Sequence, residues 1–345
     1  MTIPKINAFP TYWENGMKLG AAHFQHLEES IEDNVRDGRM LAGLAMQSYG
    51  LLPNSALSLQ GSQGNAPNSV RVIVNSCRAI LPGGYRVEIL PENVRQVQLP
   101  SAFPYVEFIP SPGVNYHLYL SVDENNRVPA GIPETRPIRH PYLVPDYRVE
   151  VIPAQDAARM QRSASNQLKI AEWKDGKISE HYIPACISTG GHQTLNGWHQ
   201  WLLNQLEQIC RVAIQVIHEH RLKDQPRAAF CQPIITHIRS KLGYFKYVLP
   251  QLSPLHLIAY YADLAGLVQC IIETGNRDFT LNFLQNGRTN NLLPAIQQLL
   301  APEKINPEEI LTSLILVKQF GESLFITIKM MNERASRGPG GGDQR

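Results

Sequence analysis

The stretch that most restricts the fold is "TLNGWHQWLLNQLEQICRVAIQVIHEH", which begins at Thr194. Its apolar residues recur at spacings of three and four, the spacing that places side chains on one face of an α-helix. The pattern continues without a break from Leu195 to Val216, so the predicted helix is long. The residues of this continuous apolar face are Leu195, Trp198, Leu202, Leu206, Ile209, Ala213 and Val216.

Two later stretches predict helices of the same kind. "SPLHLIAYYADLAGLVQCIIETG" offers Ser253 as an N-cap and Pro254 at the first helical position, and it ends at a glycine. Its apolar positions run nearly all round, which is typical of a helix buried in a bundle. "INPEEILTSLILVKQFGESLFITIKMMNER" starts with Asn306 as a cap and Pro307 in the first turn. Its apolar residues then follow a four-three rhythm that resembles a coiled-coil seam interrupted once by glycine: Ile310, Leu314, Val317, Gly321, Leu324, Ile328 and Met331.

Seams of this length predict helices that one subunit cannot cover alone, and therefore an oligomer. Seven residues of the two seams are proposed for the contact between subunits: Trp198, Leu202, Ile209, Val216, Leu314, Leu324 and Ile328.

The region from about residue 52 to residue 184 has a different residue pattern. Short strand-like runs such as "VRVIVNSCRAIL", "YRVEIL" and "YHLYLSV" are separated by turn residues such as "PGG" and "KDGK". This pattern is typical of an antiparallel sandwich or barrel. The predicted fold class is therefore α+β and multidomain: a β-sandwich domain with an N-terminal helix over residues 1–193, a helical bundle over 194–333 and a flexible tail over 334–345.

Composition excludes several classes of protein. The net charge is +2 with lysine and arginine spread along 345 residues, so no basic stripe predicts nucleic-acid binding. Five scattered cysteines without a C-x-x-C pair indicate a reducing compartment. The N-terminus has no secretion signal, and the most apolar helical run carries Asp263 and two tyrosines. We expect a cytoplasmic protein without direct membrane insertion.

No catalytic, cofactor or metal site is predicted. His23, His26 and Glu29 share one helical face, but no second cluster supplies further metal ligands. The sequence lacks a G-x-S-x-G elbow, a P-loop, a dinucleotide-binding fingerprint and an H-E-x-x-H motif.

The opening segment "YWENGMKLGAAHFQHLEES" is the other unusual feature. Trp13, Met17 and Phe24 supply large apolar area, Gly16 permits a tight turn, and the helix that follows is expected to turn polar residues outward. Aromatic and methionine side chains are the usual anchors of protein interfaces, yet they also dominate protein cores. Two interpretations therefore stay open: a docking element, or a cover for the sandwich core.

Taken in order, these residues resemble the TssK family, the trimeric baseplate subunit of the bacterial type VI secretion system. "WENGMKL" followed by "HFQ" is similar to the N-terminal signature of that family. "SCRAILPGGYRVEI", "HYIPACIST", "SPLHLIAYYADLAGLVQCI" and "NNLLPAIQQLL" resemble later family segments in the same order over residues 10–300. The sequence departs from the family pattern in having Gly83 where aspartate is usual and Ala21-Ala22 where Pro-Gln usually precedes the His-Phe-Gln.

The resemblance implies a β-sandwich shoulder that binds the TssF/TssG wedge, a helical neck that forms a homotrimer, and a C-terminal head that docks on a membrane anchor. The chain ends some tens of residues beyond the expected neck, so the head is expected to be absent. The alternatives are a phage-like tail or receptor-binding structural protein and, more distantly, a metal-dependent hydrolase. The candidate wedge-interface residues are Trp13, Gly16, Met17, His23 and Phe24.

Overall fold

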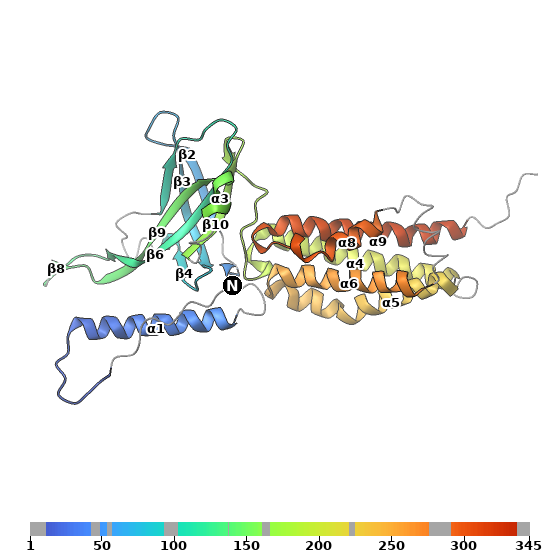
Figure 1. The fold of residues 1–345 in the computed structure, drawn as a ribbon, viewed down its shortest axis with the longest axis horizontal. Helices are drawn as coiled ribbons and strands as arrows, with labels where there is room; N and C mark the ends of the chain where they lie inside the picture. Colours follow the sequence, from blue (N-terminus) through green and yellow to red (C-terminus); the bar gives the residue numbers. More distant parts are fainter. Residues whose placement is uncertain are drawn as a thin grey trace, which may run out of the picture. The chain divides into compact units, whose positions relative to one another are not determined.

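The computed structural model describes residues 12–42, 49–53, 57–92, 103–136, 138–160, 166–220, 225–275 and 291–336. Contacts divide the chain into two compact units, Met1–Ile187 and Ser188–Arg345. The first is rich in β-strands and the second is helical, as Figure 1 shows. The α+β fold class predicted from the sequence is confirmed.

The first unit is built from two main antiparallel sheets. The longest strand of the first sheet, β3 (Val70–Ile80), pairs with β1 (Gly50–Leu51), β2 (Ser58–Gln63), β4 (Arg86–Ile89) and β5 (Tyr105–Phe108). The second sheet has the order β11 (Lys177–Ile178), β10 (Gln167–Lys174), β6 (Tyr116–Ala130) and β9 (Tyr142–Pro153). A short helix, α3 (Ala154–Met160), follows β9.

Side chains from both sheets meet in one core. The Phe108 ring on β5 lies with its centroid 5.6 Å from that of Trp173 on β10, edge to face. The Tyr147 hydroxyl on β9 accepts a hydrogen bond of 3.3 Å from the Glu88 amide on β4. Strand residues that alternate toward this core have almost no exposed surface: Val72, Val74, Val87, Leu118, Leu120 and Ile170.

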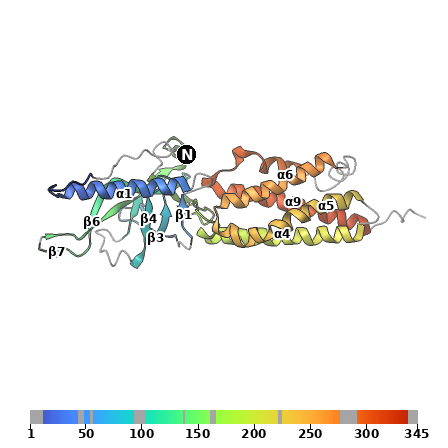
Figure 2. The ribbon, with the colours of Figure 1, turned by 90° about the horizontal axis from the view of Figure 1, so that it is seen from below.

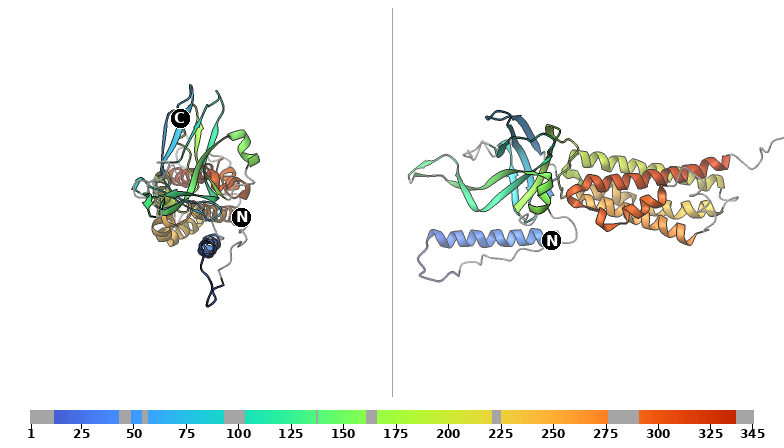
Figure 3. Two further views of the ribbon diagram at one scale, coloured as in Figure 1. Left: turned by 90° about the vertical axis from the view of Figure 1, so that its left-hand side faces the viewer. Right: turned by 45° about the horizontal axis from the view of Figure 1, so that its top comes forward.

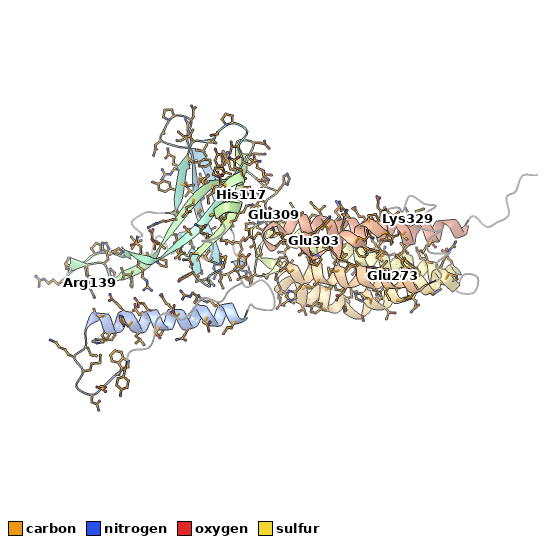
Figure 4. All side chains as sticks on the ribbon, viewed as in Figure 1. His117, Arg139, Glu273, Glu303, Glu309 and Lys329 are labelled. Carbon is orange, nitrogen blue, oxygen red and sulfur yellow. The ribbon has the colours of Figure 1, made fainter. Side chains whose placement is uncertain are left out.

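Strands β6 and β9 continue beyond the sandwich as a two-stranded arm. Their pairing shifts register between Asp123 and Arg127 and then runs on to the pair Ala130–Tyr142. A small hairpin of β7 (Glu134–Thr135) and β8 (Ile138–Arg139) lies at the end, with Arg139 at its tip (Figure 4). The arm exposes apolar side chains, including Leu143 at 58% of its surface.

The second unit is a bundle of helices that run beside one another in Figure 2. It contains α4 (Gln193–His220), α5 (Gln225–Gly243), α6 (Pro254–Thr274), α8 (Leu292–Leu299) and α9 (Ile310–Ser336). Helix α4 packs on α5 and α9, and α6 packs on α5, α8 and α9. Short helical turns precede or connect them: η2 (Thr189–Gly191), η3 (Tyr244–Val248), η4 (Leu249–Gln251), η5 (Pro302–Lys304) and η6 (Pro307–Glu309).

The helix starts predicted from the sequence are confirmed. The Ser253 hydroxyl accepts a hydrogen bond of 3.3 Å from the Leu255 amide at the start of α6. The Asn306 side chain accepts one of 3.0 Å from the Glu308 amide, and α9 continues from the turn that Pro307 opens. Side-chain oxygens at these positions satisfy amides that have no partner within the helix.

Both predicted seams lie inside the bundle of a single chain. Leu202, Leu206, Ile209, Ala213 and Val216 on α4 have no exposed surface. The α9 seam is equally buried, and its glycine has a packing role: a Cβ on Gly321 would collide with the Gln205 side chain of α4. One chain therefore covers these helices itself, contrary to the expectation that a neighbouring subunit must do so.

Among the described residues, two helices are long and apolar enough to cross a membrane by length and composition, Pro254–Thr274 and Ile310–Asn332. Both contribute fully buried side chains to the core of the bundle, among them Tyr261, Leu264, Val317 and Phe320. The Tyr261 hydroxyl donates a hydrogen bond of 3.0 Å to the Leu202 carbonyl of α4. Their apolar character is thus accounted for by packing within the chain.

Candidate protein–protein interface

The predicted wedge-interface residues gather at the start of helix α1 (Ala21–Ala42). The Trp13 ring centroid lies 6.1 Å from that of Phe24 and 6.3 Å from that of His23. Trp13 is 45% exposed and Phe24 is 50% exposed. The cluster therefore presents aromatic surface to solvent and does not cover the sandwich core.

A tight turn and a helix cap hold this cluster together. Gly16 has φ +85°, and the Met17 amide closes the turn by donating to the Glu14 carbonyl over 3.2 Å. At the helix start, Nδ1 of His23 accepts a hydrogen bond of 3.1 Å from the Gly20 amide. The His23 amide in turn donates a hydrogen bond of 3.1 Å to the Gly20 carbonyl, so the side chain of His23 supplies one half of a capping box. His23 thus shapes the helix start while its ring lies beside that of Trp13.

Across the ranges that the structure describes, no three histidine, cysteine, aspartate or glutamate side chains gather closely enough to hold a metal ion.

The polar side of α1 faces the sandwich. Ser30 and Asp33 are buried, with 2% and 8% of their surface exposed. The Arg36 guanidinium bonds to Asp33 and to the Tyr85 hydroxyl, and Arg39 donates a hydrogen bond of 3.1 Å to the Gly84 carbonyl. The helix is therefore seated on the turn between β3 and β4 by charged and polar groups.

The conformation of the β3–β4 turn allows α1 to approach it closely. Gly84 has φ +84°, a conformation that side chains other than glycine rarely adopt. A Cβ there would lie 2.6 Å from Cγ of Arg36 and 3.1 Å from the Arg36 carbonyl oxygen. Burial and the neighbouring Arg86 lower the pKa of Arg39. Gly84 and Tyr85 belong to the "LPGGYRVEI" segment. Its second glycine is the one feature of that segment indicating that another part of the chain packs closely against this turn.

The apolar side of α1 is only partly covered by the sandwich and its arm. We call Phe24, Leu27, Ile31 and Val35 the α1 stripe; their spacings of three and four place them along one face of the helix. Ile31 is 53% exposed and Val35 is 44% exposed. Helix α1 does turn polar residues such as Glu28, Glu29 and Glu32 outward, as expected, but it also exposes its apolar stripe, and the two side chains that it buries, Ser30 and Asp33, are polar.

The α1 stripe forms one wall of a groove of about 780 Å³. Ile31 and Val35 line it on the helix, and Leu143 and Pro145 line it on the arm. At the rim, Nη2 of Arg127 lies 2.5 Å from Glu32. The groove thus has a mixed lining, in which these apolar side chains lie among charged ones of both signs, including Asp33, Arg39 and Arg86.

The predicted trimerisation residues are placed differently. Six of the seven have no exposed surface in a single chain, so they have none to offer to a second copy: Leu202, Ile209, Val216, Leu314, Leu324 and Ile328. The seventh, Trp198, is half-buried and packs edge to face on Trp201 with ring centroids 6.0 Å apart.

An exposed apolar strip runs beside these core residues. Trp201 is 37% exposed on α4, and Ile315 and Ile326 are 41% and 45% exposed on one face of α9. Nζ of Lys318, between the two isoleucines, lies 5.5 Å from the centroid of the Trp201 ring. We call Trp198, Trp201, Ile315 and Ile326 the bundle strip. Sequence periodicity missed it because its residues flank the seams instead of belonging to them.

The fold matches solved structures over most of the chain. A crystal structure of TssK aligns with a TM-score of 0.53 at 15% identity, covering 94% of this chain and 69% of that one. TssK from the type VI secretion system of EAEC, solved with a nanobody, gives 0.53 at 14% identity over 89% and 68% of the two chains.

The chain has the TssK fold. A TssK–TssF–TssG baseplate subcomplex solved by cryo-electron microscopy gives a TM-score of 0.48 at 14% identity, covering 97% of this chain and 100% of that one. No protein-family model and no curated protein matches the sequence. At these identities the likeness to TssK concerns the fold, which agrees with the order of elements that the sequence motifs predicted.

Proposed function

We propose that the chain is a structural, non-enzymatic baseplate subunit of a type VI secretion system, acting in the cytoplasm as a homotrimeric adaptor between TssF/TssG-like wedge proteins and a membrane anchor. The observation that carries the proposal is the TssK fold over 94% of the chain. It is supported by exposed apolar surfaces on both units, since contiguous patches of this kind mark protein interaction sites.

Each surface has a role in the proposal. The bundle strip is the contact between copies in the trimer, because it is an exposed apolar surface that lies directly beside the seams of α4 and α9. The Trp13–Phe24 cluster is part of the wedge contact, together with Gly16, Met17 and His23, which fix its shape. Tryptophan in particular is enriched among residues that dominate binding energy.

Co-purification with wedge proteins tests this function. The full chain, expressed with TssF and TssG homologues from the same gene cluster, is expected to elute with them. Purified without those proteins, the chain is expected to have the mass of three copies by light scattering. Trp13→Ala with Phe24→Ala should abolish wedge binding and leave both mass and circular dichroism unchanged. His26→Ala, on the same helix but outside the cluster, is the matched control. A monomeric chain, or wedge binding that survives the double substitution, would contradict the proposal.

The phage-like alternative makes a different prediction. A tail or receptor-binding protein would be encoded beside phage structural genes and would show no affinity for wedge proteins.

A further inference from the structure

Strand β2 leaves one edge of its sheet without a partner among the described residues, since it pairs with β3 alone. The Val74 amide, opposite Leu59, donates a hydrogen bond of 3.0 Å to the Pro104 carbonyl and therefore points away from β2. Antiparallel pairs alternate between hydrogen-bonded and non-hydrogen-bonded ones. Leu59, Gly61 and Gln63 consequently turn their N–H and C=O groups toward the free edge.

The other edges of the two sheets carry features that usually prevent pairing with a further strand, namely short length, charge, proline or a covering element. Strands β1 and β11 have two residues each, and β11 carries Lys177. Strand β4 carries Arg86 and Glu88. Strand β9 contains Pro145 and Pro153, and β5 lies against it. Strand β2 has six residues, SLQGSQ, without a charge or a proline. The shift in its pairing with β3 lies at its first residue, so the rest of the edge is regular.

The inner face of β2 has space for a side chain beside Gly61. A Cβ built on Gly61 would lie 3.9 Å from Cδ1 of Ile178 and 3.9 Å from Cζ3 of Trp173, which is ordinary contact distance. These three residues help to line a pocket of about 560 Å³ between β2 and the β10–β11 hairpin. Residues directly opposite each other on antiparallel strands project from the same face of the sheet. A residue of an added strand opposite Gly61 would therefore place its side chain in this pocket.

The edge and the pocket together define the chemistry of the occupant. The main-chain groups of β2 recognise an extended strand. A glycine on an edge strand is best covered by an aromatic or other large apolar residue on the neighbouring strand. A second copy of β2 does not supply such a residue, because glycine, serine and glutamine fill the middle of that strand. Pairing of two identical edges is also two-fold symmetric, which three copies in a ring cannot satisfy.

We propose that the free edge of β2 binds an extended segment of a partner protein by strand addition, with one large apolar side chain of that segment in the pocket beside Gly61, Trp173 and Ile178. The backbone of β2 supplies the hydrogen bonds, and the pocket supplies the selectivity for one side chain. The inference goes beyond the proposed function, because neither the Trp13–Phe24 cluster nor the bundle strip takes part in this contact.

Synthetic peptides test the proposal on the full chain. The probe is a nine-residue peptide with a central phenylalanine, a valine two residues to either side of it and threonine at the other positions. When the phenylalanine lies opposite Gly61, its amide and those of the two valines face β2. By isothermal titration calorimetry, the probe should bind with a Kd below about 1 mM. N-methylation of these amides should weaken binding at least about tenfold, whereas N-methylation of the two threonine amides beside the phenylalanine should leave the Kd within about twofold.

Substitutions in the chain locate the site. Gly61→Val fills the pocket at ordinary contact distance, so the variant should fold and should bind the probe severalfold more weakly. Gln60→Val, on the opposite face of β2, is the matched control and should leave binding unchanged. Failure of the unmodified probe to bind at about 1 mM, equal affinity of the two methylated peptides, or unchanged affinity in Gly61→Val would each overturn the proposal. So would a fall in the light-scattering mass of free Gly61→Val, because a second copy would then occupy the edge.

The outcome is separable from that of the proposed function. The peptide experiment uses the chain without wedge proteins, and the co-purification experiment changes only Trp13 and Phe24. If the chain is a trimer that binds the wedge but does not bind the probe, the adaptor role stands and the edge of β2 does not accept an added strand.

Discussion

Helices α1 and α4 carry the same kind of sequence pattern and use it in opposite ways. Each has apolar residues at spacings of three and four over several turns. Helix α4 turns these residues into the bundle, where Leu202 and Ile209 have no exposed surface, whereas α1 leaves Ile31 and Val35 about half exposed and buries Ser30 and Asp33. An apolar stripe in a sequence indicates which side chains favour burial. It does not indicate whether the same chain or another molecule covers them.

The difference follows from what each helix can pack against. Helix α4 meets the apolar faces of α5 and α9 in its own unit. The surface offered to α1 is a polar turn, Gly84-Tyr85-Arg86, next to an arm whose apolar residues face the groove. The right-hand view of Figure 3 shows α1 beside the strands and α4 among the other helices of its unit.

The largest effect on stability is expected from a charge placed in the core of the bundle, and the adjacent residue on the surface serves as the comparison. Leu202→Asp places an unpaired carboxylate in the apolar interior of the bundle, which costs several kcal/mol or forces the group to take up a proton. We expect loss of the cooperative thermal transition of the helical unit by circular dichroism. Trp201→Asp, one residue earlier in the bundle strip, should leave the fold intact and lower the light-scattering mass to that of a monomer. If Trp201→Asp unfolds the chain as Leu202→Asp does, the bundle strip is core and the comparison fails.

A single added methyl group at Gly84 is expected to disrupt the contact between α1 and the β3–β4 turn. Gly84→Ala meets the Arg36 side chain and backbone and also requires a residue other than glycine at φ +84°, with a backbone cost of about 1–2 kcal/mol. We expect faster hydrogen exchange along α1 and a lower melting temperature of the β unit. Gly176→Ala is the matched control, because Gly176 has φ +78° but nothing within 4 Å of its Cβ position. Equal exchange of α1 in the two variants would show that the turn does not hold the helix.

Acid should weaken the β unit more than the bundle. Burial by itself would raise the pKa of Glu172, but hydrogen bonds from Lys169 and Lys174 outweigh it, and the net pKa is lowered. A carboxylate with a lowered folded pKa stabilises the protein above its unfolded pKa and loses that contribution as the pH falls through the folded value. We expect Glu172→Gln to lower stability at pH 7 and to flatten the decline of stability toward acid pH, measured by urea unfolding. If the free energy of unfolding of the Glu172→Gln variant falls with pH as steeply as that of the wild type, Glu172 does not contribute to the loss of stability in acid.

The smallest expected effect is on the stripe itself. Ile31→Asp with Val35→Asp changes two exposed residues, and surface substitutions usually alter stability by no more than about 0.5 kcal/mol. The melting temperature of the full chain should therefore remain close to that of the wild type. A loss comparable to that of Leu202→Asp would mean that the stripe is covered within the protein.

Much of the architecture followed from local patterns, because those patterns act within a few residues. The helix starts at Ser253 and Asn306 follow from side-chain capping. The seams of α4 and α9 follow from periodicity, and the paired strands around "PGG" from turn chemistry. Which helices cover the seams did not follow, because periodicity cannot distinguish a helix of the same chain from one of another chain as the partner; here helices of the same chain bury them.

The candidate site was predictable only in part. The aromatic residues Trp13 and Phe24 were identifiable by type, and the structure brings them together. The orientation of α1 was not, because it depends on a turn about fifty residues away that presents Gly84 and Tyr85 to Arg36. Contacts over such separations carry no local sequence signal.

Thiol labelling tests the central claim, that the α1 stripe is open to solvent in the native chain whereas the core of the bundle is closed. The chain supplies both standards: Cys270 is exposed, and Cys231 is fully buried, with burial raising the pKa of its thiol to about 12. In the native full chain carrying Ile31→Cys, followed by mass spectrometry of peptides, the new thiol is predicted to react with maleimide at a rate close to that of Cys270. Protection of Ile31→Cys to the level of Cys231 would contradict the account.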